Sequence, residues 1–144
     1  MRSGLHVVLT CSPDPVEVAM TAEIERLARA QTCHDNSPVK LVNVGGQISL
    51  PLLAALLKLC KFYVGVDSAP MHMAAALNVP QVALFGPSWV EEWRPWSDKA
   101  TVIYAGDYGP LPHPDSINTD DTTRLLSAIP TEVVIQATRE LMAR

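Results

Sequence analysis

The sequence predicts an α/β protein built on a parallel β-sheet, and two observations lead to that class. Five apolar runs rich in β-branched and aromatic residues alternate with segments of helical periodicity. Several of these runs are continuous rather than alternating, which is typical of parallel strands covered on both faces. Strands and helices in alternation are joined by right-handed crossovers, so we expect a Rossmann-like, doubly wound sheet. Ligands bind such sheets beyond the carboxyl ends of the strands, where loops lead into helices.

The elements follow one another in a regular order. Strands are predicted at His6–Thr10, Val39–Val44, Phe62–Val66, Gln81–Phe85 and Thr101–Tyr104. Helices are predicted at Pro15–Ala30, Leu50–Leu59, Met71–Leu77 and Glu132–Met142. The first helix carries an amphipathic stripe at spacings of four and three, made of Val16, Met20, Ile24 and Leu27. Residues 105–121, "AGDYGPLPHPDSINTDD", are rich in Gly, Pro and Asp without periodicity and predict a long surface loop.

Size and charge limit the classes of protein to which the chain can belong. Its 144 residues fit one domain with a sizeable core. The formal net charge is −4 and the basic residues are scattered, so nucleic acid is not an expected partner. The first apolar run is too short for a secretory signal or a membrane span, so we expect a soluble, cytoplasmic protein that could still lie on a membrane surface.

The cysteines indicate a reducing compartment. Cys11, Cys33 and Cys60 lie far apart and form no C-x-x-C pair. Neither a disulfide framework nor a zinc site is therefore expected.

The richest chemistry follows the third predicted strand. Asp67 comes directly after Phe62–Val66 and precedes Ser68, Ala69 and Pro70, which lead into a helix. Ser68 can cap that helix and Pro70 suits its first turn. The free N–H groups at the helix start, together with the helix dipole, predict a site for a phosphate or diphosphate.

His72 and Asp67 each have a structural and a functional interpretation. An imidazole in the first turn could donate to a phosphate oxygen or stabilise a leaving group, and it could instead be a packed histidine under a loop. Asp67 could be a helix cap, and strand-end aspartates also bind sugar hydroxyls. Neither interpretation of Asp67 excludes the other.

Two further stretches carry weaker signals. The strand-to-helix turn with Gly45 and Gly46 allows positive φ and close approach of a ligand, although such turns also need glycine for steric reasons alone. The loop after Gly86 holds all three tryptophans, Trp89, Trp93 and Trp96. They could line a cleft or anchor a second domain, or they could fold back onto the sheet.

The segment "VGVDSAPMHMAAALNVPQVALFGPS" resembles the signature of the bacterial lipopolysaccharide heptosyltransferases, glycosyltransferase family 9. That pattern has Asp, Ser or Thr, Gly or Ala, two residues, His, an alanine-rich helix and a strand ending in Phe-Gly-Pro. The similarity extends to "VVLTCSPDP", "VGGQISLPLLAALLKLC" and "EWRPWS". "YAGDYGPLP" and "LLSAIPTEVV" are most similar to the branch that adds the third heptose to the inner core.

The resemblance implies the donor-binding C-terminal half of a GT-B glycosyltransferase that uses ADP-L-glycero-D-manno-heptose without a metal. It places Asp67 on the heptose hydroxyls and Ser68, Ala69 and His72 at the diphosphate. It places Gly45 and Gly46 near the adenosine. Asp14 or Glu17 would be the acidic residue that contacts the ribose. The acceptor would be the lipopolysaccharide inner core, and peripheral association with the inner membrane would follow.

The same resemblance implies differences from the family. An N-terminal acceptor domain with the general base is not found in the sequence, and the first strand here matches the second strand of the family's C-terminal domain. The missing first βα unit would lie at the centre of a sheet of order 3-2-1-4-5-6. Two strand edges would then lack partners, so we expect either that the remaining strands pair directly or that another chain supplies a strand.

Three functions remain as hypotheses. The first is the donor-binding half of a heptosyltransferase, and the second is a non-catalytic nucleotide-binding or subunit-interaction module. The third is a response-regulator receiver with Asp67 as phosphoacceptor. The receiver requires an acidic pair after the first strand and a lysine after a late strand, whereas Lys99 precedes its strand.

Overall fold

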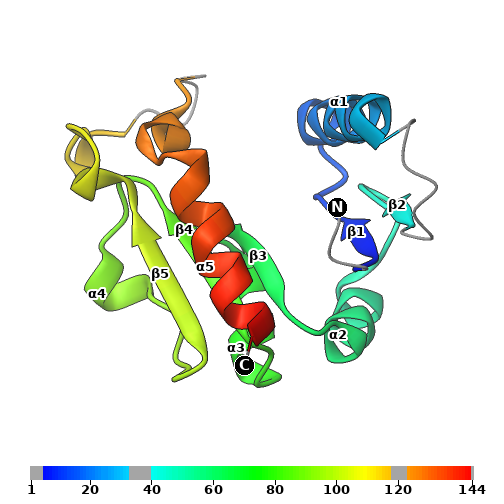
Figure 1. Cartoon of the computed structure of the whole chain (residues 1–144). Coiled ribbons are helices and arrows are strands. Elements are labelled where there is room, and N and C mark those ends of the chain that lie inside the picture. Colours follow the sequence, from blue (N-terminus) through cyan, green and yellow to red (C-terminus); the bar gives the residue numbers. More distant parts are fainter. Residues whose placement is uncertain (1–4, 33–39, 118–122, 144) are drawn as a thin grey trace. The chain divides into compact units, whose positions relative to one another are not determined.

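A computed structural model describes residues 5–32, 40–117 and 123–143 of the chain (Figure 1). The described residues form two compact units, one within Met1–Leu50 and one within Pro51–Arg144. Both are built from parallel strands and helices in alternation. The predicted α/β class is therefore confirmed.

The first unit holds β1 (Val7–Leu9), α1 (Pro15–Thr32) and β2 (Leu41–Asn43). The two strands pair in parallel, and Val8 lies opposite Val42. Both strands are shorter than predicted, and Val39, the predicted start of the second strand, lies outside the described residues. The helix connects them as a crossover, as expected for a parallel pair.

The face of α1 that is buried differs from the predicted one. The stripe residues Val16, Met20, Ile24 and Leu27 are all exposed, Val16 to 67%. Thr21 is buried instead, and its hydroxyl donates to the Glu17 carbonyl at 2.8 Å. A Cβ on Gly45 would lie 3.4 Å from the Thr21 methyl, so α1 approaches the glycine turn with a small side chain. The stripe prediction was wrong because this close approach favours a small residue over a long apolar one.

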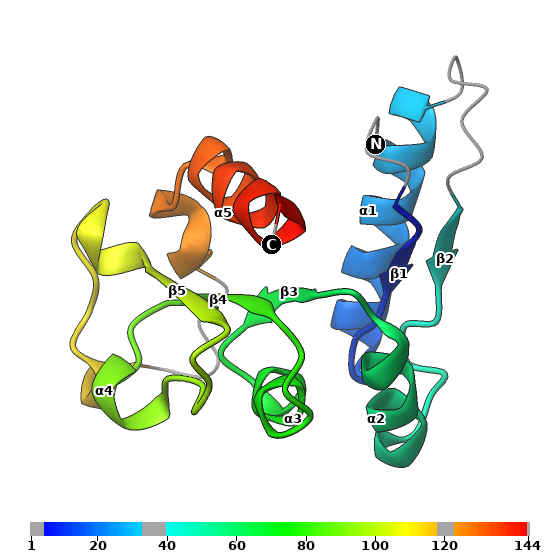
Figure 2. The ribbon, with the colours of Figure 1, turned by 60° about the horizontal axis from the view of Figure 1, so that its bottom comes forward.

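The second unit begins with α2 (Leu50–Leu59), which has the predicted bounds. Its sheet has the order β3 (Tyr63–Val66), β4 (Gln81–Phe85), β5 (Ala100–Tyr104), all parallel. The helices are α3 (Ala69–Ala76), α4 (Val90–Trp93) and α5 (Thr131–Ala143). Figure 2 shows α5 on one face of this sheet and α3 and α4 on the other.

Each face of the three-stranded sheet has its own apolar core. Met71 of α3 packs with Phe85 of β4, and both side chains are fully buried. On the opposite face, Val82 packs with Ala137 and Leu141 of α5. The helix predicted at Glu132–Met142 is therefore present and packs on this face through residues four apart.

Coverage on both faces holds for β4 alone among the described strands. All but one of its residues are buried, whereas β1, β2 and β3 alternate. Val8 and Val42 are exposed on one face of the first sheet, and Val64 and Val66 on one face of β3. Continuous burial, expected of several strands, is therefore observed at β4 and not at β1, β2 or β3, which each expose every second residue on one face.

β1 pairs with β2 alone and β3 pairs with β4 alone, so each has one unpaired edge within the described residues. Both expectations for these edges, direct pairing of the remaining strands and a strand from another chain, stay predictions. The predicted loop after β5 contains the short 3-10 helices η1 (Ala105–Asp107) and η2 (Pro114–Ser116). A third, η3 (Leu125–Ala128), precedes α5.

Over the three described ranges, no helix is both long and apolar enough to cross a bilayer.

Candidate functional site

The turn from β3 to α3 holds four of the predicted site residues: Asp67, Ser68, Ala69 and His72. The Asp67 amide continues the sheet and donates to the Leu84 carbonyl at 3.0 Å. The half-buried Asp67 carboxylate has no hydrogen bond or ion pair with any described residue. It lies at the carboxyl end of the strand, where ligands bind in parallel sheets.

Ser68 occupies the N-cap position of α3 with extended backbone, but its side chain does not cap the helix. The hydroxyl donates to the Val66 carbonyl at 3.0 Å instead. The prediction of a side-chain cap was therefore wrong. A hydroxyl that faces back to the strand leaves the start of α3 without an internal acceptor.

The start of α3 has free amides, as expected, but some amides of its first turn have partners. The Met71 and His72 amides donate to the Ser68 carbonyl at 3.0 and 3.4 Å, and Pro70 has no N–H. Among the described residues, neither the Ala69 amide, the first of the helix, nor the Ser68 amide directly before it has an acceptor. Two adjacent amides and the positive end of the helix dipole remain available to an anion.

His72 is half-buried in the first turn of α3 and contacts an aromatic ring from another helix. The His72 and Trp93 ring centroids lie 6.5 Å apart at 66°, an edge-to-face arrangement. Trp93 belongs to α4, a helix of four residues that sequence patterns did not predict. The contact holds the imidazole against α4, and nothing local in the sequence indicates it.

Tyr63 is a second residue that sequence reasoning missed. A Cβ on Gly65 would overlap the Tyr63 ring, so the phenol lies along its own strand toward the turn. Burial raises the pKa of the Tyr63 phenol, and a side-chain hydrogen bond with Ser68 opposes this in part. The signal that could have found it is Tyr-x-Gly just before Asp67, which recurs at Tyr104 and Gly106.

The other predicted site residues belong to the first unit, at the start of α1. Asp14 Oδ1 accepts from the Val16 and Glu17 amides at 2.8 and 3.2 Å, so Asp14 is the N-cap of α1. Glu17 Oε2 accepts from the Ser12 amide at 3.0 Å. Both acids have structural partners, and both side chains are exposed.

The glycine turn lies beside this helix start. Gly46 has φ of +69°, so the predicted positive φ is confirmed at this residue. Its amide donates to the Cys11 carbonyl at 3.2 Å. A Cβ on Gly45 would lie 2.7 Å from Cys11 Sγ. The pair therefore packs against the loop after β1, and the steric reason for glycine is satisfied within this unit.

Comparisons with known proteins bear on both groups of residues. The sequence pattern of glycosyltransferase family 9 (heptosyltransferase) matches residues 1–121, which include every predicted site residue. The chain belongs to glycosyltransferase family 9.

Relatives within family 9 carry heptosyltransferase names. Lipopolysaccharide heptosyltransferase 3 of Escherichia coli is 40% identical over 139 residues, 96% of this chain and 38% of the relative. The solved structure of the family 9 glycosyl transferase from Veillonella parvula has a TM-score of 0.70 at 27% identity, covering 99% of this chain and 38% of that one. The E. coli ADP-heptose LPS heptosyltransferase II structure has a TM-score of 0.65 at 31% identity, covering 96% and 36%. The chain thus spans about 38% of the length of these relatives.

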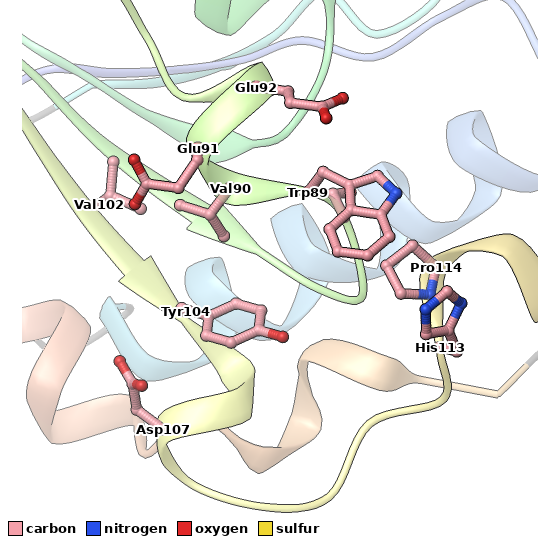
Figure 3. Close-up of a pocket in the computed structure, with 10 residues that line it drawn as sticks. Trp89, Val90, Glu91, Glu92, Val102, Tyr104, Asp107, His113 and Pro114 are labelled. Carbon is pink, nitrogen blue, oxygen red and sulfur yellow. The ribbon is translucent and has the colours of Figure 1, made fainter.

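The tryptophans of this family 9 chain do not fold back onto the sheet. Trp89, Trp93 and Trp96 are all exposed, Trp96 to 90%. Trp89 lines a pocket of about 530 Å³, here called the α4–β5 pocket (Figure 3). Its walls include Trp89, Glu91, Tyr104, Asp107, His113 and Pro114. The prediction that a tryptophan lines a cleft is confirmed for Trp89.

Metal and thiol chemistry were not predicted for this chain. Across the residues that the structure describes, no three His, Cys, Asp or Glu side chains are grouped so that they could hold a metal ion. Cys11 and Cys60 are free thiols, and burial raises the pKa of Cys60. Cys33 lies outside the described residues.

Lys99 precedes β5, so it lies at the end of the sheet opposite Asp67, which does not fit the receiver hypothesis.

Proposed function

We propose that the chain is the donor-binding part of a glycosyltransferase that transfers heptose from ADP-L-glycero-D-manno-heptose to the lipopolysaccharide inner core. Family 9 membership and the heptosyltransferase names of the relatives support this. One related structure is named for ADP-heptose. The observation that carries the proposal is the β3–α3 turn, with an unpaired carboxylate, two free amides and an imidazole in one short segment.

In this proposal each group of the turn has one role. The Asp67 carboxylate accepts hydrogen bonds from heptose hydroxyls, because no described residue occupies its oxygens. The Ser68 and Ala69 amides donate to the diphosphate, and His72 donates to the same charge from the first turn of α3. Gly45 and Gly46 pass near the adenosine. Asp14 or Glu17 accepts a hydrogen bond from a ribose hydroxyl through the carboxylate oxygen that has no backbone partner at the helix start.

The reaction is an inverting displacement at the anomeric carbon of the heptose. An acceptor hydroxyl forms the new C–O bond while the bond to the diphosphate oxygen breaks, and ADP leaves with the electron pair. The amides and His72 stabilise the charge that develops on that oxygen. The proton of the acceptor hydroxyl goes to a general base, which we place in an acceptor domain outside these residues, in a two-domain GT-B arrangement.

The acceptor domain is also the proposed source of the missing strand. Within its own unit, each of β1 and β3 has a free edge whose main-chain donors and acceptors lack partners among the described residues, and an added parallel strand would satisfy such an edge. The proposal places the assembled enzyme in the cytoplasm, at the inner-membrane face where its lipid-linked acceptor lies. The chain by itself would bind ADP or ADP-heptose weakly and transfer nothing.

Calorimetry with ADP and ADP-heptose tests the proposal on four proteins: the wild type, Asp67→Ala, His72→Ala and the control Asp98→Ala. Asp98 is an exposed carboxylate outside the turn. We expect the first two substitutions to weaken binding and the control to leave it unchanged. Thermal melts of all four proteins separate lost binding from lost folding. If both variants bind as well as the wild type, the site assignment is wrong.

The alternative, a non-catalytic nucleotide-binding module, predicts the same binding but no transfer under any condition. Addition of the acceptor domain of a family 9 relative distinguishes the two. Transfer of heptose in the mixture, lost in the Asp67→Ala variant, supports the enzyme. Binding that survives with no transfer supports the module.

A further inference from the structure

We propose that the α4–β5 pocket binds a small organic ammonium ion, a primary amine on a compact carbon skeleton. This goes beyond the proposed function, because every residue that lines the pocket lies outside the groups assigned to ADP-heptose. The pocket belongs wholly to the second unit. Its volume of about 530 Å³ accommodates a molecule the size of a monosaccharide.

The charge of the lining selects a cation. Glu91, Glu92 and Asp107 contribute three carboxylates, and no lysine or arginine lines the pocket. Within the described part of the chain, none of the three forms an ion pair. All three side chains are exposed, so their charge is hydrated; they repel an anionic ligand and attract an ammonium ion.

His113 does not offset this charge. Its Nδ1 accepts from the Asp115 amide at 3.3 Å. The Asp115 carboxylate lies 3.7 Å from the same nitrogen, a long contact between two exposed side chains that adds little. Three carboxylates line the pocket against one histidine, so a single imidazole is too few to neutralise the lining.

The aromatic walls select an organic cation over a bare metal ion. Trp89 and His113 pack edge to face, with ring centroids 5.3 Å apart at 83°. Figure 3 shows this pair on one side, Glu91 and Asp107 on the other, and Tyr104 between them. Among the described residues no acidic group is clustered tightly enough to chelate a metal. Carboxylates spread around indole and phenol rings instead suit an ammonium group with a carbon body that contacts the rings.

The test titrates the full chain with glucosamine, ethanolamine and N-acetylglucosamine while the indole N–H signals are followed by NMR. The Trp89 signal is assigned with Trp89→Phe. We expect glucosamine to shift the Trp89 signal saturably and N-acetylglucosamine, which lacks the charge, to bind at least about fivefold more weakly. Added salt should weaken glucosamine binding. Ethanolamine tells whether the amine alone suffices or a ring is also needed, and binding by it supports the ammonium class.

Substitutions locate the site. Glu91→Gln should weaken glucosamine binding by about two- to fivefold, the range of an exposed ion pair. Asp98→Asn removes a carboxylate outside the pocket and should leave binding unchanged. Equal binding of glucosamine and N-acetylglucosamine would overturn the proposal, as would no shift of Trp89 with any amine or an equal loss in both variants. ADP binding is measured in parallel, so failure here is distinct from failure of the donor site.

Discussion

The start of α1 allows a quantitative test of which forces hold the first unit together. Asp14 Oδ1 accepts from two backbone amides, at 2.8 and 3.2 Å. Asp14→Ala removes this cap and should lower the free energy of unfolding by about 1 kcal/mol, within the usual range of about 0.5–2 kcal/mol. Asp14→Asn keeps an acceptor oxygen and loses the charge at the helix N-terminus, so it should lose only about 0.3–1 kcal/mol.

Urea unfolding followed by far-ultraviolet circular dichroism measures both variants. With a typical urea dependence of about 1–3 kcal/mol per molar, a loss of 1 kcal/mol lowers the midpoint by about 0.3–1 M. Asp14→Asn should lie between the wild type and Asp14→Ala. A midpoint for Asp14→Ala equal to that of the wild type would refute the cap. A midpoint for Asp14→Asn as low as that of Asp14→Ala would show that charge, not hydrogen bonding, is responsible.

Three other predictions follow from the packing. Gly46→Ala should destabilise the protein by about 1–2 kcal/mol because the φ of Gly46 is +69°. Gly86→Ala is the control: the nearest atom to an added Cβ is 3.7 Å away, so stability should change by less than about 0.5 kcal/mol. Equal thermal melts for the two variants would contradict this prediction. Phe85→Ala, at a fully buried ring, should lose about 3–5 kcal/mol in denaturant unfolding, and Trp96→Ala, at an exposed ring, should lose less than about 0.5 kcal/mol. Burial raises the pKa of the Tyr63 phenol in the folded chain. The stability that the protonated phenol contributes is therefore complete below the ordinary tyrosine pKa of about 10 and is lost as pH rises through the raised pKa of the folded chain. Tyr63→Phe should flatten the fall in unfolding free energy above about pH 10, and an unchanged alkaline profile would argue against a buried phenol.

Long apolar elements were predictable from the sequence. β4 and α2 have their predicted bounds. β4 is a short continuous apolar run, as a strand buried on both faces should be, and α2 is an apolar run long enough for a helix. α4 was missed because Val90–Trp93 is one turn long and a single turn has no periodicity. The buried face of α1 was missed because it depends on Gly45, which lies across the unit and not along the helix.

The places of the candidate site residues along the elements were predictable, but the free amide donors beside them were not. The sequence predicts Asp67 directly after a strand and His72 in the first turn of the following helix, and the structure places both residues there. The number of free amides depends on where α3 begins. Pro70 lies in the first turn, as predicted, and supplies no amide, while the Met71 and His72 amides donate to the Ser68 carbonyl, which the sequence does not indicate. The Trp93 contact with His72 joins two helices through tertiary packing, which local patterns do not contain.

Amide NMR of the ¹⁵N-labelled chain during titration with ADP-heptose tests the central proposal most directly. We expect the Ser68 and Ala69 amides to shift the most and together, because they are the unpaired donors at the start of α3. The same titration of Asp67→Ala should need a higher concentration of ligand for the same shift. Binding detected by calorimetry while the Ser68 and Ala69 amides stay at their free positions would contradict the proposal.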